Sequence, residues 1–299
     1  MRCFFQADDG GLCAGVTEGI VSCLDRGPLA GVGIIMGAPH DAEAAALLGT
    51  REHIALTIHL NLLEGRPAAP PRRIPSLAGK DGCFHHSLAT LAAELFFGGR
   101  TRKNLFNSIE MEFRAQIERF RALLPGRPLR LDSHLHVHVL PPLRPLLRIL
   151  IREYGVSYVR VPAELFHIPA APPAEQIAGQ TRRALLAAWA SPLRALLEAE
   201  GVRSGDFFVG AFASGRMTLD KLRASLLAVR RKGAGGETVE IMVHPGGLRS
   251  GEEADVKPAY RGFYASAARE TERNMLASPA LPALLESLNM IPYFPGAGA

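Results

Sequence analysis

The sequence of 299 residues contains little cysteine, few aromatic residues and no long uncharged stretch. Its four cysteines, Cys3, Cys13, Cys23 and Cys83, form no Cys-x-x-Cys pair, which argues against a zinc ribbon and a disulfide framework. Aromatic residues make up only 7%, and the basic residues behind the formal net charge of +5 are scattered. The basic stripe interleaved with aromatics that binds nucleic acid is therefore missing, and we expect no nucleic-acid partner.

Membrane-spanning and export signals are also missing from the sequence. The longest uncharged stretch, residues 27–39, is interrupted by proline and glycine and is shorter than the roughly 20 residues that cross a bilayer. Asp8 and Asp9 follow so early that no apolar signal-peptide core fits before them. We expect a cytoplasmic protein without a transmembrane segment, and the pattern also allows a homo-oligomer.

Short apolar runs alternate with segments of helical periodicity, which is typical of βα units around a parallel sheet. The expected strands cover residues 3–7, 31–36, 54–59, 129–132, 156–161, 207–210, 239–243 and 290–294. The expected helices cover residues 15–26, 41–48, 87–97, 105–124, 143–154, 183–200, 219–232 and 264–276. Seven or eight strands without a repeat or a linker predict one α/β domain over residues 1–299, a TIM-barrel-like (β/α) barrel of parallel strands with insertions near 66–82 and 163–179.

Polar side chains follow four of these expected strands. In parallel α/β folds, functional groups collect at the carboxyl ends of the strands because the loops leaving that rim meet at one mouth. Metal-capable or acid/base residues stand there at Asp8-Asp9, at His59 and Asn61, within residues 132–138, and at His244. We therefore expect a single site that draws on the first, third, fourth and seventh strands.

The segment Asp132-Ser133-His134-Leu135-His136-Val137-His138 places three of the ten histidines at alternate positions. In an extended conformation the three histidines share one face, whereas in a helix His134 and His138 become neighbours. His134 is nearest to the strand end and is the expected metal ligand. The alternative for His136 and His138 is that they only hydrogen-bond the loop.

Asp9, His59 and His134 together supply one carboxylate and two imidazoles, a set that suits one divalent metal with open coordination positions. A single aspartate before Gly10 would be explained by turn chemistry, but two adjacent carboxylates repel each other unless a cation or donors relieve them. His59 alone would be interpreted as a core histidine. Mg²⁺ or Zn²⁺ is expected, and Co²⁺, Ni²⁺ and Mn²⁺ also fit such a site.

In four motifs, in the same order along nearly the whole chain, the sequence resembles the YdjC-like carbohydrate deacetylases, the group that includes ChbG and HpnK. These motifs are Ala7-Asp8-Asp9-x-Gly11-Leu12, His59-Leu60-Asn61-Leu62-x-Glu64-Gly65-x-Pro67, Asp132-Ser133-His134-x-His136-x-His138-x-x-Pro141 and His244-Pro245-Gly246. The resemblance implies metal ligation by Asp9, His59 and His134, in agreement with the choice made from the residues. Gly10 stands where the family usually has Phe, which predicts a more open or mobile site wall.

The resemblance further implies removal of the N-acetyl group from an amino sugar, in a saccharide or a glycolipid of the chitooligosaccharide or N-acetylglucosaminyl hopanoid type. Asp8 is the expected general base, and His244 is expected to protonate the departing amine. Asp132 is expected to orient a histidine through its other N–H. For Arg160 two roles are expected as alternatives: it binds substrate hydroxyls, or it pairs with an acidic neighbour such as Glu164. Substrate binding or support of the ligands is also the expected role of Asn61, His136 and His138.

Three other functions compete with this interpretation. A barrel amidohydrolase or phosphoesterase with two metals would need His136 and His138 as additional ligands. A non-catalytic sugar-binding or metal-storage protein would leave Asp8 without a role, and a non-haem iron oxygenase usually has a strand-only scaffold that does not fit the pattern. An apolar rim that would suit a lipid-linked sugar is expected near Phe96, Phe97 and Leu105.

Overall fold

A computed structural model describes residues 1–295 of the chain. The strands are β1 (Arg2–Gly10), β2 (Leu29–Ile34), β3 (Ala55–Leu60), β4 (Arg130–Ser133), β5 (Tyr158–Val159), β6 (Phe207–Val209), β7 (Thr238–Val243) and β8 (Ile291–Pro292). Seven of them form a sheet in the order β5-β4-β3-β2-β1-β7-β6, and β8 pairs with the start of β1. Every pairing between these strands is parallel.

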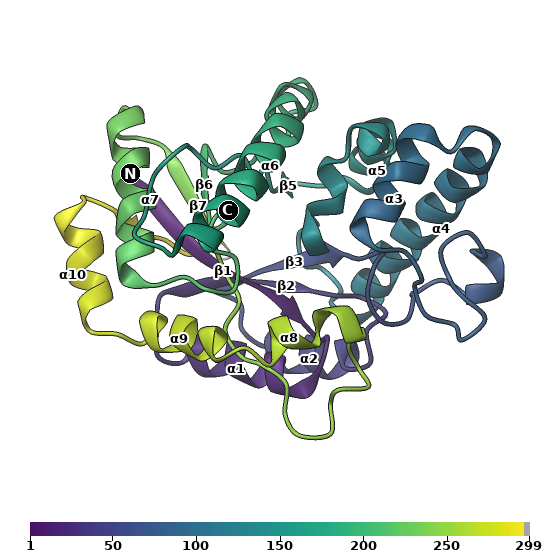
Figure 1. The fold of residues 1–299 in the computed structure, drawn as a ribbon, viewed down its shortest axis with the longest axis horizontal. Coiled ribbons are helices and arrows are strands. Elements are labelled where there is room, and N and C mark those ends of the chain that lie inside the picture. Colours follow the sequence, from purple (N-terminus) through teal and green to yellow (C-terminus); the bar gives the residue numbers. More distant parts are fainter. Residues whose placement is uncertain (296–299) are drawn as a thin grey trace.

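The sheet curls until its two edges approach each other. Isolated parallel bridges join Tyr158 of β5 to Arg203, and Glu164 to Phe208 of β6. The result is an irregular, partly open (β/α) barrel, which confirms the expected parallel α/β barrel of seven or eight strands. Figure 1 shows β1, β2 and β3 crossing the middle of the molecule.

Helices surround this sheet. They are α1 (Ala14–Leu24), α2 (Asp41–Gly49), α3 (Leu88–Phe97), α4 (Gly99–Leu123), α5 (Arg144–Tyr154), α6 (Pro173–Ala199), α7 (Leu219–Lys232), α8 (Arg261–Tyr264), α9 (Ala267–Leu276) and α10 (Ala280–Ser287). In Figure 1, α3, α4 and α5 gather at one end of the molecule, and α7 and α10 lie at the other. Among the described residues, no helix combines the length and apolar character needed to cross a membrane.

The central strand β1 explains why acidic residues can occupy the middle of the fold. All of its residues after Arg2 are buried, as expected for a parallel strand that is covered on both faces. The first part, residues 3–7, is buried and apolar except for Gln6, and Asp8 and Asp9 follow at the carboxyl end of the strand. Asp9 adopts a left-handed conformation with φ of 70°, which aspartate tolerates better than most residues. This turn ends β1 and presents two buried carboxylates at the barrel mouth.

The structure corrects several expected boundaries. Helix α6 begins at Pro173 and not at residue 183, because proline is well suited to the first turn of a helix, and this part of the expected insertion 163–179 is therefore helical. Helix α4 already begins at Gly99. The expected helix 264–276 is divided into α8 and α9, since the Ser266 side chain accepts a hydrogen bond from the amide of Ala268 and starts a new helix. Helix α10 was not expected.

The other insertion, residues 66–82, is a surface segment with one short 3₁₀ helix, Pro71–Arg73. It is fastened to α4 by the buried Glu112, whose carboxylate accepts hydrogen bonds from the amides of Ala68 and Ala69 at 2.8 and 2.9 Å. Burial raises the pKa of Glu112 to about 7, although the donors around it act in the opposite direction. The segment is therefore held against the barrel and is not a free loop.

Candidate metal centre

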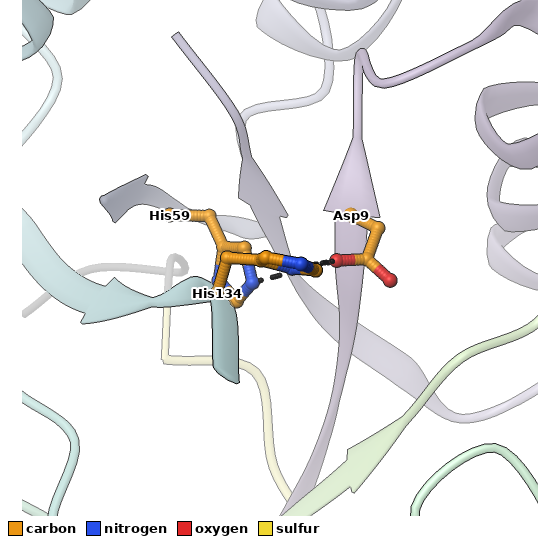
Figure 2. Close-up of side chains that lie close together, drawn as sticks. All are labelled: Asp9, His59 and His134. Atoms are coloured by element: carbon orange, nitrogen blue, oxygen red, sulfur yellow. Dashed lines mark hydrogen bonds and ion pairs between the residues drawn. The ribbon is translucent and has the colours of Figure 1, made fainter. Parts of the chain in front are cut away.

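Three side chains from separate strand ends meet at the carboxyl rim of the barrel. Oδ1 of Asp9, at the end of β1, lies 3.0 Å from Nδ1 of His134 and 3.5 Å from Nε2 of His59. His59 is near the end of β3, and His134 directly follows β4. All three side chains are buried, and Figure 2 shows both imidazoles pointing at the Asp9 carboxylate. The expected ligands Asp9, His59 and His134 thus lie together, each offering a ligand atom within 4.8 Å of the others.

His59 is oriented by a residue on the neighbouring strand. The Nδ1 atom of His59 lies 2.8 Å from Oδ1 of Asp132, and the two residues are register partners in the pairing of β3 with β4. Gln6 donates from Nε2 to the other oxygen of Asp132 at 2.8 Å. With Nδ1 engaged by a carboxylate, Nε2 is the nitrogen that faces Asp9. This is the arrangement expected for Asp132.

His134 has a supporting carboxylate that the sequence had not singled out. Its Nε2 lies 3.0 Å from Oε2 of Glu64, on the side of the ring away from the Asp9 contact. The same Glu64 oxygen accepts a hydrogen bond from the Tyr264 hydroxyl at 2.9 Å. Glu64 is part of the motif that begins at His59, but its role becomes visible only when the chain is folded.

Asn61 fixes the turn that carries Glu64. Its Oδ1 accepts hydrogen bonds from the amides of Leu63 and Glu64 at 3.0 and 3.1 Å, and its Nδ2 donates to the Glu64 carbonyl. Gln116 on α4 then pairs with both backbone groups of Asn61. Asn61 therefore supports the site through the backbone and is not among the residues that line the pocket.

The charges of the cluster reinforce one another. Burial would raise the pKa of Asp9, but hydrogen bonds from His134 and His59 outweigh it and hold this pKa well below its usual range. Burial would lower the pKa of both histidines, yet carboxylates raise that of His59 to about 10 and that of His134 to about 9. Without a bound metal ion, the protonated histidines, together with the buried Arg269, whose Nη1 lies 3.7 Å from Oδ2 of Asp9, balance the buried carboxylates of this site.

Asp8 points into a second, adjoining network. The guanidinium of Arg160 donates hydrogen bonds to both carboxylate oxygens of Asp8, from Nη1 to Oδ2 at 2.6 Å and from Nη2 to Oδ1 at 2.8 Å. Arg160 also contacts Asp132 at 2.9 Å and Glu240 at 2.5 Å, and it is fully buried. Burial raises the pKa of Asp8 to about 6, against the pull of Arg160 and His59.

The contacts of Arg160 and His138 bear on the roles expected for them. Arg160 does pair with acidic residues, but not with Glu164, whose carboxylate accepts hydrogen bonds from the backbone amides of Gly210 and Phe212. Arg160 is not among the described residues that line the pocket, so it is not placed to bind a sugar hydroxyl. His138 hydrogen-bonds Ser133 through Nδ1 and lies 2.9 Å from the Arg160 carbonyl through Nε2, so it secures the loop after β4.

The loop after β4 is neither the extended strand nor the helix considered for the three histidines. Leu135 and His136 both adopt left-handed conformations, with φ of 49° and 56°, between short 3₁₀ turns. The kink separates the three rings. His134 faces Asp9, His138 turns to the loop, and His136 is directed into the pocket with no hydrogen-bond partner for Nδ1 among residues 1–295.

A pocket of about 290 Å³ opens above the cluster. Asp8, Asp9, His59, His134 and His244 form its floor and sides, and apolar residues of α6 form much of one wall. His244 directly follows β7, and burial lowers its pKa to about 3. The insertion 66–82, which the structure describes completely, contributes no lining residue, whereas Glu175, Ala178 and Gly179 of the second insertion do.

Gly10 does not face this pocket. A Cβ atom at this position would lie only 3.1 Å from both the Val32 side chain and the Gly33 carbonyl on β2. The expectation of a more open site wall at Gly10 is therefore wrong. The left-handed conformation of Asp9 and the register shift between Ala7 and Gly10 interrupt the alternation of side chains at the end of β1, so Gly10 faces β2 and Ile20 of α1.

The donor set fits a divalent metal. One carboxylate oxygen and two imidazole nitrogens converge on one point, and Oδ2 of Asp9 has no hydrogen-bond partner among the described residues. A second group, Asp8, His59 and Asp132, is equally compact, but Arg160 contacts both of its carboxylates and a cation there would be repelled. His136 and His138 belong to neither of these groups of described residues.

Comparison with known proteins identifies the family. The model of the YdjC-like protein family matches residues 2–287. A carbohydrate deacetylase of Mus musculus is 32% identical over 299 aligned positions, covering 95% of this chain and 91% of its own, and one of Danio rerio is 28% identical with similar coverage of 91% and 90%. A chitooligosaccharide deacetylase of Yersinia pestis is 33% identical over about half of each chain, 50% and 54%.

A solved structure shares the fold. The crystal structure of a putative cellobiose-phosphate cleavage protein from Enterococcus faecalis superimposes with a TM-score of 0.71 at 21% identity, covering 97% of this chain and 95% of that one. At this identity the likeness concerns the fold alone. The family match over nearly the whole chain and the converging motif residues lead to one conclusion: the chain belongs to the YdjC-like family.

Proposed function

We propose that the protein is a metal-dependent carbohydrate N-deacetylase that removes the acetyl group from an N-acetylglucosamine-containing saccharide or glycolipid. The observation that carries this proposal is the convergence of His59 and His134 on Asp9 at the floor of a pocket, with a separate carboxylate, Asp8, beside them. The names of the mouse, zebrafish and Yersinia relatives support a carbohydrate substrate and acetyl removal. The proposal treats residues 1–299 as one catalytic domain.

Asp9, His59 and His134 would hold the metal. When bound there, a divalent metal would lower the pKa of a water molecule and polarise the acetyl carbonyl. Two imidazoles and a single carboxylate favour Zn²⁺ or a similar transition metal, with Mg²⁺ as the other candidate. Asp132 and Glu64 keep the two imidazoles in the orientation that such ligation needs.

Asp8 is positioned to act as the general base. Its carboxylate lines the pocket and is held in place from behind by Arg160, so the remaining lone pairs of its oxygens can accept a proton from the attacking water. With a pKa of about 6, Asp8 is ionised at neutral pH, and its pKa is close enough to the surrounding pH for the carboxylate to take up a proton readily. Hydrolysis needs that proton on the departing nitrogen.

His244 lines the same pocket and is assigned to this second transfer. Because burial lowers its pKa to about 3, its ring is uncharged at neutral pH and carries no spare proton. His244 therefore passes on only a proton that it receives within the same turnover, namely the one that Asp8 has taken from water and then releases to His244. His136, buried beside it with an unpartnered nitrogen, is assigned to a hydrogen bond with the substrate.

The test is acetyl release from diacetylchitobiose, followed by mass spectrometry. Metal-stripped protein should be inactive and should recover when Zn²⁺ or Mg²⁺ is returned. The variant Asp8→Asn should bind metal as the wild type does but lose activity, whereas Asp25→Asn, which changes an exposed aspartate paired with Arg51, should remain active. Activity that survives both metal removal and Asp8→Asn would contradict the mechanism.

A sugar-binding protein without catalysis is the other candidate for this site. It would bind the acetylated sugar in the pocket but leave it unchanged after long incubation with metal-loaded protein. The ionisable Asp8 beside the metal-capable cluster favours the enzyme, because binding alone does not need a second buried carboxylate there.

A further inference from the structure

An exposed corner between α3 and α4 has a composition that the catalytic site does not explain. Helix α3 ends in Phe96 and Phe97, here called the corner phenylalanines, of which Phe97 is 86% exposed. No other large apolar side chain among the described residues is as exposed as Phe97. Gly98 and Gly99 follow, and they allow α4 to begin at once.

The tightness of this corner depends on its two glycines. Gly99 has φ of 53°, and a Cβ at Gly98 would approach the Glu94 carbonyl to 2.4 Å. The chain therefore reverses within two residues and has no loop that could fold back over Phe97. The phenylalanine side chain is left at a protruding turn.

Three cations follow directly on α4: Arg100, Arg102 and Lys103, here called the corner cations. All three are exposed, and the first turn of α4 contains no acidic residue. In the part of the chain that the structure describes, the ion pairs of α4 are made by arginines further along, Arg114, Arg119 and Arg121, and by none of the corner cations.

This placement of positive charge is unfavourable for the isolated protein. The N-terminus of a helix carries the positive end of the helix dipole, and cations in the first turn are repelled by it. An anionic surface resting on the corner would remove that repulsion and would be met by the three side chains together. The charge of the corner thus points to an anionic partner.

The corner is continuous with the catalytic pocket. The Phe96 ring lies 6.4 Å from the ring of Trp189, and Trp189 lines the pocket together with Leu185, another exposed apolar residue of α6. Apolar side chains therefore extend from the pocket wall to the tip of the corner. Helix α4 runs from this corner toward the amino end of β4, so the corner lies at the pocket end of the barrel.

We propose that this corner docks the protein on an anionic lipid bilayer, with the corner phenylalanines inserted at the interface and the corner cations on lipid phosphates. Aromatic side chains next to basic ones are the combination that holds peripheral proteins on such surfaces. An acidic protein or a nucleic acid would satisfy the cations but gives no reason for an apolar path that leads into the pocket. The docking stands independently of catalysis, and its use, which is to present a lipid-linked sugar to the pocket, rests on the proposed function.

Binding of the full-length protein to vesicles tests the proposal. Vesicles of phosphatidylglycerol mixed with phosphatidylcholine should bind the protein, and vesicles of phosphatidylcholine alone should not. Trp189 is the single tryptophan of the chain, so lipids brominated on their acyl chains should quench its fluorescence when the corner is inserted. The variant Phe97→Ser should weaken vesicle binding about tenfold or more, since it removes the burial of one phenylalanine side chain.

The opposite end of the barrel supplies the matched control for the aromatic change. Ile291 on β8 is 64% exposed and pairs with the start of β1, at the end of the barrel away from the pocket. The variant Ile291→Ser should leave vesicle binding unchanged. Both variants alter exposed side chains and should have wild-type melting temperatures.

Charge is tested in the same way. Changing the three corner cations to Gln should weaken binding on the order of a hundredfold, since each basic side chain near an anionic bilayer contributes about a factor of five. The same change at residues 230–232, the three basic residues that end α7, alters the net charge equally and should have little effect.

Several outcomes would overturn the proposal. These are failure to bind anionic vesicles, binding that the corner variants do not weaken, and a dimer in light scattering that Phe97→Ser dissociates, which would make the corner a self-interface. RNA binding that depends on the same residues, without vesicle binding, would do so as well. Deacetylation of soluble diacetylchitobiose should be unchanged in Phe97→Ser, so a failure of docking and a failure of the proposed activity are distinguished.

Discussion

Glu64 and His134 form a buried pair in which Oε2 of the carboxylate lies 3.0 Å from Nε2 of the imidazole. The opposite nitrogen, Nδ1, faces Asp9 at 3.0 Å. A carboxylate this close to Nε2 favours a proton on that nitrogen and leaves Nδ1 as the ligating nitrogen. His59 has the mirror arrangement, with Asp132 on Nδ1 and Nε2 toward Asp9. The site thus uses a different nitrogen of each histidine.

The pair predicts the effect of Glu64→Gln on metal affinity. The amide keeps the size of the side chain but loses its charge, so Nδ1 of His134 becomes a weaker ligand. We expect the dissociation constant for Zn²⁺, measured by competition with a chromophoric chelator, to rise about 10- to 100-fold. Activity should recover at saturating metal. The control Glu110→Gln changes a surface glutamate on α4 that pairs with Arg114 and should not alter affinity. Unchanged Zn²⁺ affinity in Glu64→Gln would show that Glu64 only packs against His134 and does not strengthen it as a ligand.

The pH dependence of the reaction should report the ionisation of the Asp8 carboxyl group. The general base must be ionised. Burial raises the pKa of Asp8 to about 6 in the metal-free protein, and a cation bound nearby lowers it, so kcat/KM should fall about tenfold per pH unit below a midpoint at or under pH 6. The measurement is a pH profile of kcat/KM on diacetylchitobiose between pH 4.5 and 8 at saturating metal. A profile that stays flat down to pH 4.5 would remove Asp8 from this role.

Stability should decrease as the pH rises through the range in which Glu112 titrates. Its pKa in the folded protein is about 7, against an ordinary value of 4.5. Between these values the folded protein keeps a proton that the unfolded chain has lost, so the free energy of unfolding falls with rising pH, by up to about 3 kcal/mol from this residue. Urea denaturation at pH 5, 6, 7 and 8 measures this slope.

The variant Glu112→Gln isolates this contribution. It has no proton to lose and should show a clearly smaller slope than the wild type. Glu118→Gln, at an exposed position on the same helix, should keep the wild-type slope. Equal slopes in Glu112→Gln and the wild type would mean that another group, such as Glu272 with its raised pKa of about 7, dominates.

Gly10→Ala should destabilise the fold without changing substrate binding. The added methyl group would lie 3.1 Å from both the Gly33 carbonyl and the Val32 side chain, so β1 and β2 must adjust. We expect a loss of about 1–3 kcal/mol in the free energy of unfolding, typical of overpacking in a core. The value of KM should not change. The control Gly236→Ala adds a methyl group with no neighbour within 4 Å and should be neutral.

Much of the fold follows from local patterns. The apolar runs that became β1, β3 and β7 are long and nearly uniform, so their positions could be predicted to within a few residues. Segments rich in proline and alanine were less informative, because the same residues suit both a loop and the first turn of a helix. This ambiguity explains the late start expected for α6.

The sequence by itself determined which residues stand at the strand ends, and with the parallel topology this was enough to bring Asp9, His59 and His134 to one rim. Only the tertiary structure decided the rest: which nitrogen of each histidine faces Asp9, that Glu64 supports His134, that Arg160 serves Asp8, and where Gly10 points. Many of these contacts join residues far apart in the chain, 73 positions for His59 and Asp132 and 152 for Asp8 and Arg160. They depend on the rotamers that close packing allows, and no local sequence pattern encodes such distances.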